Sequence, residues 1–264
     1  MPAGVKTALA LLALAGAVVL CYFAYEGLRA KAPQPEPPDL EDYARKARYG
    51  TDPRARCEAI QKVGRDASPD AVPVLLETLQ DPNEYVAAAS ARFLGKRRVT
   101  EAVEPLTRQL ERDSRDLRRA TIYALGDIGH PSAAKALAGQ ITARNPFAAD
   151  AAWAMGKLRD PKTGGIPDDA EQALIELLDS SVLRIRIGAI HGLRLGARSQ
   201  AAVDALDDLK RDPKRGLDEA IFTDPRTGKP RMILEKFPAS PTHITIFCQW
   251  AIDAIRARMG EKEG

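Results

Sequence analysis

The histidines of this chain are too few and too scattered to form a catalytic or metal site. His130 precedes a proline, His191 precedes a glycine and His243 precedes an isoleucine, so no two of them have the spacing of paired ligands. The sequence has no Cys-x-x-Cys, His-Glu-x-x-His or Gly-x-Ser-x-Gly motif and no phosphate-binding glycine loop. We therefore predict that the chain is not an enzyme and that it has no catalytic residue, no cofactor and no metal.

Basic and aromatic side chains are the better candidates, because they bind partners without catalysing a reaction. Basic residues cluster at 96–98 and 112–119, where a single basic edge could hold an acidic partner or lipid head groups. A net charge of +3 and an aromatic content of 5% do not favour nucleic acid. The candidate partner-binding residues are Arg118, Arg119, Arg184, Trp153 and Trp250.

A recurring glycine indicates the elements that position these side chains. The glycines are spaced by 31, 31, 30 and 36 residues, and an insertion at 163–168 accounts for the longer interval. A fixed period of this length is typical of one supersecondary unit stacked several times. The series is Gly64, Gly95, Gly126, Gly156 and Gly192.

The residues before each glycine predict a helix with one apolar face. Small or apolar residues recur one, five and nine positions before it, which is one side of a helix. Each helix follows a start signal, such as Asp52-Pro53, Asp81-Pro82 or Asp179-Ser180. A second set of short apolar helices lies between them, so the sequence predicts an all-α solenoid of about five antiparallel helix pairs over 39–211.

Three segments carry a resemblance to a known family: 81–95 (DPNEYVAAASARFLG), 113–137 and 145–161. They resemble HEAT repeats, and specifically the short HEAT-like repeats of phycobilisome lyases. The resemblance implies a right-handed superhelix with a lined concave surface, and it says little about chemistry. One enzyme of this architecture, deoxyhypusine hydroxylase, holds two irons through His-Glu pairs, and this sequence has no His-Glu.

The same resemblance implies a role for some of the arginines. Arg56, Arg118 and Arg184 share the position eight before the glycine. In HEAT repeats an arginine there pairs with an aspartate of a neighbouring repeat, which predicts a ladder to Asp81, Asp113 and Asp127. His191 falls at the apolar position before its glycine, where we expect a hydrogen-bonded core histidine, although Gly196 gives a competing alignment.

The N-terminus predicts attachment to a membrane. Residues 7–25 carry no charge, which is long enough for a helix that crosses a bilayer, and a cleaved signal peptide is the alternative. We assign 1–25 to an uncleaved single-pass anchor and the proline-rich 26–38 to a stiff spacer. The short basic start favours the repeats on the extracytoplasmic, periplasmic side, although the flanking charges are nearly balanced.

The C-terminal extension, 212–264, departs from the repeat. Residues 222–234 predict a hairpin-like loop, and an amphipathic helix follows, with Trp250 off its apolar face. This extension either caps the open end of the solenoid or docks a partner. Cys57 and Cys248 would lie at opposite ends, and we expect no disulfide between them.

These features favour a non-catalytic, membrane-tethered adaptor that binds another protein in the solenoid groove or through the last helix. The alternative is a nucleic-acid-binding module, which needs Arg118, Arg119, Arg144 and Arg184 to converge near Trp153. A bilin lyase-like enzyme is a second alternative and rests on the family analogy alone.

Overall fold

The computed structural model describes residue 22 and residues 39–212 and 241–260, and every regular element in those ranges is helical. The α-helices are α2 (Leu40–Tyr49), α3 (Pro53–Arg65), α4 (Ala71–Thr78), α5 (Glu84–Lys96), α6 (Val103–Gln109), α7 (Arg115–Ile128), α8 (Ala134–Ala138), α9 (Ala148–Met155), α10 (Asp168–Glu176), α11 (Leu183–Gly196), α12 (Gln200–Arg211) and α13 (Pro241–Met259). Short 3₁₀ turns, η1 (Thr100–Ala102), η2 (Pro131–Ala133) and η3 (Leu177–Asp179), join some of them.

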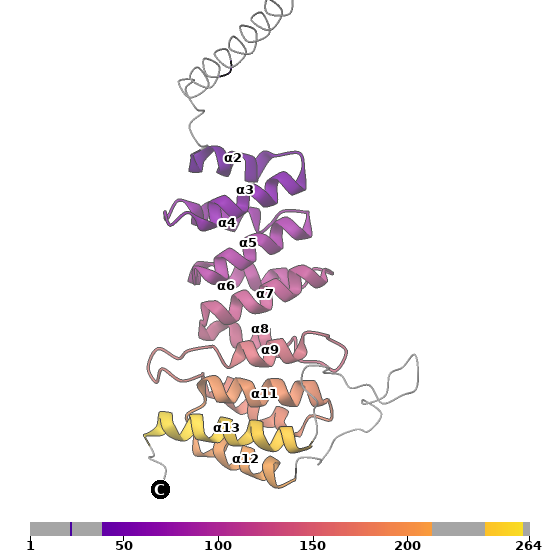
Figure 1. The fold of residues 1–264 in the computed structure, drawn as a ribbon, viewed down its shortest axis with the longest axis vertical. Helices are drawn as coiled ribbons and strands as arrows, with labels where there is room; N and C mark the ends of the chain where they lie inside the picture. The colour runs from indigo at the N-terminus through magenta and orange to yellow at the C-terminus, as the bar shows by residue number, and fades with distance from the viewer. Residues whose placement is uncertain (1–21, 23–38, 213–240, 261–264) are drawn as a thin grey trace, which may run out of the picture. The chain divides into compact units, whose positions relative to one another are not determined.

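The helices from α2 onward stack in two layers (Figure 1). One layer contains the odd-numbered helices α3, α5, α7, α9, α11 and α13, each packed against the next. The even-numbered helices form the other layer, and each packs against the odd-numbered helix that follows it. The described chain is therefore an all-helical repeat solenoid.

Close contact at glycine explains the small residues of the odd-numbered layer. A Cβ atom on Gly95 would lie 2.6 Å from the Cα atom of Ala124 on the next helix, and one on Gly126 would lie 2.9 Å from the Cβ atom of Ala154. Real Cβ atoms do not approach so closely, so the backbones of α5, α7 and α9 can touch only because these positions lack side chains. The predicted glycine face is thus confirmed as the contact between repeats.

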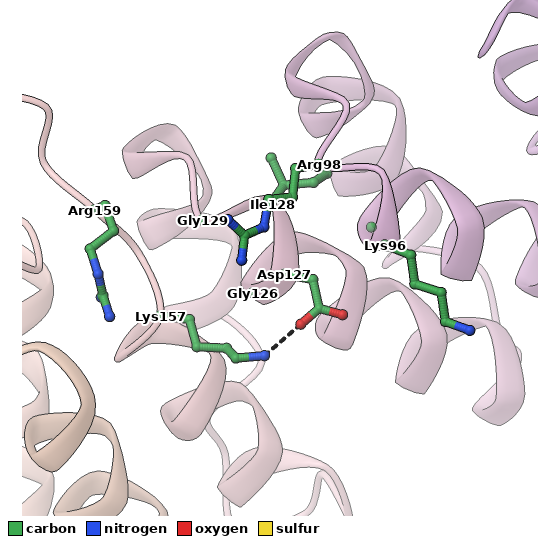
Figure 2. A pocket seen from close by; sticks show the side chains of 9 residues that line it. Lys96, Arg98, Gly126, Asp127, Ile128, Gly129, Lys157 and Arg159 are labelled. Atoms are coloured by element: carbon green, nitrogen blue, oxygen red, sulfur yellow. Dashed lines mark hydrogen bonds and ion pairs between the residues drawn. The ribbon is translucent and has the colours of Figure 1, made fainter. Parts of the chain in front are cut away.

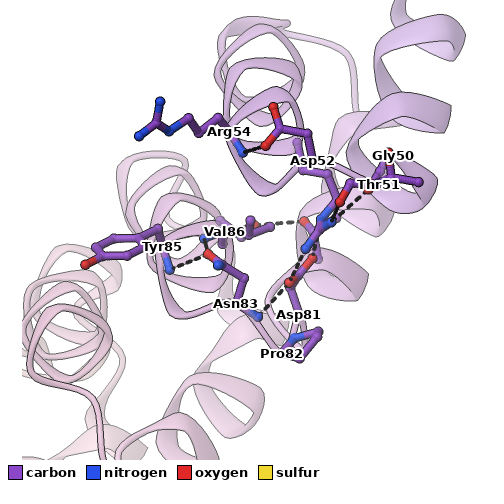
Figure 3. Close-up of polar contacts among 12 residues, drawn as sticks. Gly50, Thr51, Asp52, Arg54, Asp81, Pro82, Asn83, Tyr85 and Val86 are labelled. Carbon is purple, nitrogen blue, oxygen red and sulfur yellow. Dashed lines mark hydrogen bonds and ion pairs between the residues drawn. The ribbon is translucent and has the colours of Figure 1, made fainter.

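Helix starts agree with the predicted caps at some repeats and differ at others (Figure 3). Asp52 caps α3 by accepting from the N–H groups of Arg54 and Ala55, as predicted. The cap of α5 is Asn83, two residues after the predicted Asp81, because the Asp81 carboxylate accepts from the Asn83 N–H instead.

The start predicted at Asp179 for the helix that carries Gly192 lies further from the observed one. Asp179 ends the turn η3, and α11 begins only at Leu183, after Val182. The Ser180 hydroxyl accepts from the Val182 N–H group, so it closes a loop instead of capping the helix.

The last helix, α13, packs on both α11 and α12. Its predicted apolar face is buried: Ile244, Cys248, Ala251, Ile252 and Ile255 are each at most 2% exposed. Since α12 precedes residue 212 and α13 follows it, the predicted boundary at 212 falls between the two helices of one pair.

Several expectations concern residues that the structure does not describe. Residues 7–25, apart from Tyr22, lie outside the described residues, as do the spacer and the hairpin-like loop at 222–234. Among the helices that are described, none combines the length and the apolar character that crossing a membrane requires.

Candidate functional site

Arginines recur at the N-terminal ends of α3, α7 and α11. Arg56, Arg118 and Arg186 each donate a hydrogen bond to the carbonyl six residues earlier, with N–O distances of 2.7, 3.3 and 2.8 Å. The shared geometry shows that these three arginines occupy equivalent positions in their repeats.

The glycine contacts give the same alignment and correct the predicted one. Gly126 packs on Ala154, which lies two residues before Gly156, whereas Gly156 packs on Gly192 itself. The position on α11 equivalent to Gly156 is therefore residue 194, two residues beyond the glycine that the sequence indicates. The predicted alignment was wrong by two residues on this helix.

One rung of the predicted arginine ladder is confirmed. Arg56 donates from Nε and Nη2 to the two carboxylate oxygens of Asp81, both at 2.9 Å (Figure 3). The two side chains are only 12% and 9% exposed, so the ion pair is largely shielded from water. A paired guanidinium fork of this kind fixes α3 against the loop before α5.

The other two predicted rungs were wrong. Arg118 bonds the Arg112 carbonyl instead of an aspartate, and Arg184 donates to the carbonyls of Ala143 and Asn145. Asp127 pairs with Lys157 of the next repeat, with 2.5 Å between Nζ and Oδ1. Loop carbonyls take the place of the predicted aspartates at these arginines, although the buried Nε of Arg184 has no partner within the described residues.

The corrected alignment moves His191 out of the core. It occupies the position three before residue 194, which corresponds to Tyr123 on α7 and Trp153 on α9. All three side chains are partly exposed. The predicted core position of His191 was therefore wrong, and its helix instead presents an imidazole where its neighbours present aromatic rings.

These side chains belong to a set that we call the aromatic row: Tyr123, Trp153, His191, Phe247 and Trp250. Tyr123 and Trp153 meet edge to face, with ring centres 5.5 Å apart. The His191 ring lies 5.3 Å from that of Phe247, which lies 5.8 Å from that of Trp250. The row thus forms two aromatic groups, one on α7 and α9 and one on α11 and α13.

Charged groups flank the first aromatic group. The Tyr123 hydroxyl donates to Asp150 at 2.6 Å, and burial together with this bond raises the pKa of Tyr123 to about 12. The Lys157 ammonium lies 4.1 Å from the centre of the Trp153 ring, a cation–π contact, while it also pairs with Asp127. The rings are held in place on this surface and still present edges to solvent.

The second group differs in its exposure. Phe247 is 8% exposed, whereas Trp250 is 56% exposed. Burial lowers the pKa of His191, and the nearby Arg194 lowers it further. At neutral pH this group therefore presents a neutral imidazole beside an open indole.

Comparison with known proteins identifies the repeats. The family model for HEAT repeats matches residues 40–121 and 72–155, and the model for the PBS lyase HEAT-like repeat matches residues 148–180. The chain belongs to the HEAT-repeat family. The comparison with curated proteins finds no match.

Solved structures share the architecture of this HEAT-repeat chain at low identity. An engineered protein is 19% identical over 84% of this chain and 98% of that chain, with a TM-score of 0.49. A designed armadillo repeat protein in complex with the peptide (KR)4 is 13% identical over 83% and 100%, with a TM-score of 0.49. Human deoxyhypusine hydroxylase in complex with glycerol is 14% identical over 83% and 96%, with a TM-score of 0.40.

The HEAT repeats bring only some of the predicted partner-binding residues together. Arg119 is exposed on α7, one helical turn from Tyr123 of the first aromatic group. Trp250 belongs to the second group. Arg118 and Arg184 lie at the N-terminal ends of their helices and are bonded to loop carbonyls.

Sequence reasoning missed Tyr123, Asp150 and Lys157. A signal was available, because Tyr123 and Trp153 lie at the same distance before their glycines. The signal is weak because only these two of the five glycine helices carry an aromatic ring at that distance. The equivalence of His191 could not be seen without the two-residue correction on α11.

The described HEAT repeats hold no cluster suited to metal chemistry. Within residues 39–212 and 241–260, no three His, Cys, Asp or Glu side chains are grouped so that they could bind a metal ion. Neither Cys57 nor Cys248 forms a disulfide within these residues, and burial raises the pKa of Cys57.

Proposed function

We propose that this chain is a non-catalytic scaffold that binds a segment of another protein across the aromatic row. The observation that carries the proposal is the recurrence of part-exposed rings at one position of successive repeats. Aromatic side chains are over-represented at protein interfaces because they offer a large, rigid contact area at low entropic cost. Charged groups beside the rings would set the orientation of the bound segment.

The rings of the row are unequal in what they can contribute. Phe247 is buried and supports Trp250, so Trp250 is the side chain that is free to enter a partner. Trp153 is fixed between Tyr123 and Lys157, so it presents a preformed contact surface. Loss of Trp250, which is exposed, removes contact area without opening the core, whereas Trp153 also packs on the core.

Capture of partners by the full-length, membrane-extracted protein tests this proposal. The wild type is compared with Trp153→Ala, Trp250→Ala and a control, Tyr85→Ala, which removes an aromatic ring that is 58% exposed elsewhere on the solenoid. We expect a stoichiometric protein to be retained by the wild type and Tyr85→Ala and lost from both tryptophan variants. Equal retention by all four proteins would contradict the assignment of the surface.

The two tryptophans also provide a direct readout. They are the only tryptophans in the chain, so intrinsic fluorescence reports on the two aromatic groups alone. Addition of the purified partner is expected to shift the emission of the wild type and to leave that of each single-tryptophan variant unchanged, because those variants no longer bind it. A partner that binds the wild type without changing its emission would lie elsewhere on the solenoid.

We also propose that residues 7–25 anchor the scaffold in a membrane, with the repeats on the extracytoplasmic side. The support is the uncharged run of 19 residues and the proline-rich spacer after it. Resistance of the full-length protein to alkaline extraction tests the anchor, and digestion by external protease after opening of the outer envelope tests the orientation. Release by alkali would contradict the anchor, and protection from the protease would contradict the orientation.

A further inference from the structure

The C-terminal ends of α5, α7 and α9 surround a cavity of about 550 Å³ (Figure 2). We call it the basic cavity, because its charged lining consists of Lys96, Arg98, Lys157 and Arg159 with a single carboxylate, Asp127. Its volume lies within the range of small-ligand sites. It is separate from the aromatic row, and the two adjoin through Lys157, which contacts the Trp153 ring.

The cations of the basic cavity are only partly neutralised by the chain itself. Lys157 pairs with Asp127, and Arg159 donates to the carbonyls of Gly156, Leu158 and Leu195. Within the described residues, the Arg98 side chain makes no hydrogen bond and no ion pair. Lys96 contacts only the ring of Phe93 there, at 5.5 Å from its centre.

A charge balance shows that the excess remains positive. Each of the three helix C-termini contributes about half a negative charge. Together with Asp127 they amount to roughly 2.5 negative charges against four positive ones. The helix ends alone therefore do not account for the lysines and arginines gathered here.

Positive charge continues from the basic cavity towards α11. The side chains of Arg198 and Arg258 donate to backbone carbonyls, those of Thr163, Leu193 and Ala197, while the Arg198 backbone N–H donates to the Glu171 carboxylate. Burial lowers the pKa of Arg159, and Arg198 lowers it further, which shows that these guanidinium groups repel one another. An anion that entered the cavity would relieve this repulsion.

The backbone at Arg98 is the second observation that points to a ligand. The Arg98 N–H bonds the Gly95 carbonyl and the Val99 N–H bonds the Leu94 carbonyl, so Arg98 is the left-handed residue that ends α5. Its φ is 53°, in a region that glycine occupies without strain. The equivalent residue 31 positions later, which ends α7, is Gly129, with φ of 74°.

An arginine at this position thus carries a conformational cost that no contact of its side chain offsets within the described residues. Strained residues persist where the side chain has another use. Because Arg98 is exposed and lines the cavity, that use is contact with a molecule outside the chain.

We propose that the basic cavity binds carboxylate side chains of an acidic segment of the partner protein, a proposal that rests on the scaffold function above. Arginine forks and lysine ammonium groups both bind carboxylates, and the arginine fork does so through two parallel hydrogen bonds. The continuity with the aromatic row lets one segment present carboxylates to the cavity and apolar side chains to the rings.

The geometry favours a peptide over other polyanions. A bilayer surface is broad and does not enter a recess between helix ends. A nucleic-acid backbone carries a charge at every nucleotide and would be repelled by Asp127 and Asp150 along the same surface. A peptide can space its carboxylates to avoid both.

Binding of short labelled peptides to the full-length protein in detergent tests the proposal by fluorescence anisotropy. The probe is a peptide in which Glu and Gly alternate, and the control peptide has Lys in place of Glu. We expect the Glu peptide alone to bind, with an affinity that falls as salt is added. Anionic phosphatidylglycerol vesicles and single-stranded oligodeoxythymidine are tested in parallel.

Arg98→Gly is the decisive variant, because it removes the charge while relieving the backbone. We expect it to bind the Glu peptide about threefold more weakly, as suits one exposed ion pair, while its Tm is unchanged or raised. Arg54→Gln, which removes an exposed arginine at the opposite ends of the helices, is the matched control and should bind like the wild type. A loss of affinity therefore cannot be ascribed to unfolding.

Three results would overturn the proposal: no binding of the Glu peptide, equal binding by Arg98→Gly, or preference for vesicles or the oligonucleotide. If the tryptophan variants still lose their protein partner in any of these cases, the scaffold function stands and only the basic cavity is misassigned. If the Glu peptide binds but no partner is captured, the cavity is a carboxylate site and the scaffold function fails.

Discussion

The two ends of the odd-numbered helices use the same kind of side chain for opposite purposes. At the N-terminal ends, Arg56, Arg118 and Arg186 turn into the chain and donate to carbonyls or to Asp81. At the C-terminal ends, Lys96 and Arg98 face a cavity and have no carboxylate partner among the described residues. The first set is structural, and the second is available to a ligand.

The difference lies in which backbone groups are within reach. The loops before α3, α7 and α11 place carbonyl groups within reach of the arginine, and a buried guanidinium needs such acceptors. After α5, by contrast, the chain turns away through the left-handed Arg98, so its side chain leaves the fold. Residue type alone does not distinguish these cases, whereas the direction of the backbone does.

The largest effect is expected at the N-terminal ends. Arg56→Met leaves the Asp81 carboxylate, 9% exposed, without its guanidinium partner. Removal of one member of a buried pair costs about 3–5 kcal/mol, and we expect a loss of this size in the free energy of unfolding in urea. Arg54→Met, two residues earlier and exposed, should change it by less than about 0.5 kcal/mol. If both substitutions lowered the free energy of unfolding equally, the arginines at the N-terminal ends would have no special structural role, and the contrast with the C-terminal ends would be lost.

The alignment of α11 on which the comparison depends is tested by glycine substitutions. A Cβ on Gly156 would lie 2.2 Å from the Gly192 carbonyl oxygen, so Gly156→Ala forces the helices apart and should cost about 1–3 kcal/mol. Gly139→Ala is the control, since its Cβ would meet nothing closer than 3.5 Å. Thermal unfolding of both variants gives the measurement, and a Gly156→Ala protein as stable as the control would contradict the packing.

Much of the architecture could be predicted because it depends on local, repeated signals. A glycine once per repeat marks where two backbones touch, and a change of side chain there is not tolerated. Asp52 and Ser114 could be recognised as helix starts because capping is a short-range interaction. Signals of this kind need no knowledge of the neighbouring repeat.

The alignment of α11 could not be predicted, because two glycines compete there. Gly192 continues the sequence pattern, but Gly192 and Gly196 both lie against the Gly156 backbone in the structure. The packing of Gly156 on Gly192 shows that the equivalent position is neither glycine but residue 194, between them. The misplacement of Arg184 and His191 follows from this one error.

The candidate site was predictable in part. Trp153, Trp250 and Arg119 were recognised from residue type, and all three are on or beside the aromatic row. Of the basic cavity only the cluster at 96–98 was recognised, because the cations come from two segments about 60 residues apart that meet only in the stacked repeats. The left-handed backbone of Arg98 leaves no mark in the sequence.

Buried hydroxyl groups extend the comparison to the core. The buried Thr78 hydroxyl donates to the Val74 carbonyl and lies 2.8 Å from the Ser90 hydroxyl, so Thr78→Val should cost about 1 kcal/mol. The Thr121 hydroxyl is buried without a partner in the described part of the chain, so Thr121→Val should be neutral or stabilising. Urea unfolding of both variants checks this, and a larger loss for Thr121→Val would show that the hydroxyl has a partner.

A smaller effect of opposite sign is expected at the C-terminal ends. Arg98→Gly relieves a left-handed φ and should stabilise the protein by roughly 0.5–1 kcal/mol, since a left-handed residue with a Cβ is strained. Gly129→Ala imposes that strain on α7 and should destabilise by a similar amount. If Arg98→Gly instead lowers the Tm, the arginine side chain stabilises the fold, and the two ends of the helices are less different than proposed.

The smallest effect concerns His191, which is half-buried and packs on Phe247. It thus stands between the structural arginines of the N-terminal ends and the exposed cations of the C-terminal ends. Burial and Arg194 lower its pKa below the ordinary 6.5, so the unfolded chain binds the proton more tightly than the folded one. Its contribution to stability is therefore complete above pH 6.5 and is lost as the pH falls from there through the lowered pKa. His191→Gln removes this titration, so the Tm of the wild type should fall more steeply than that of the variant on acidification. Parallel profiles of Tm against pH for the two proteins would mean that the ring is as hydrated in the fold as in the unfolded chain. In that case an NMR titration of the His191 ring would give a pKa at the ordinary value.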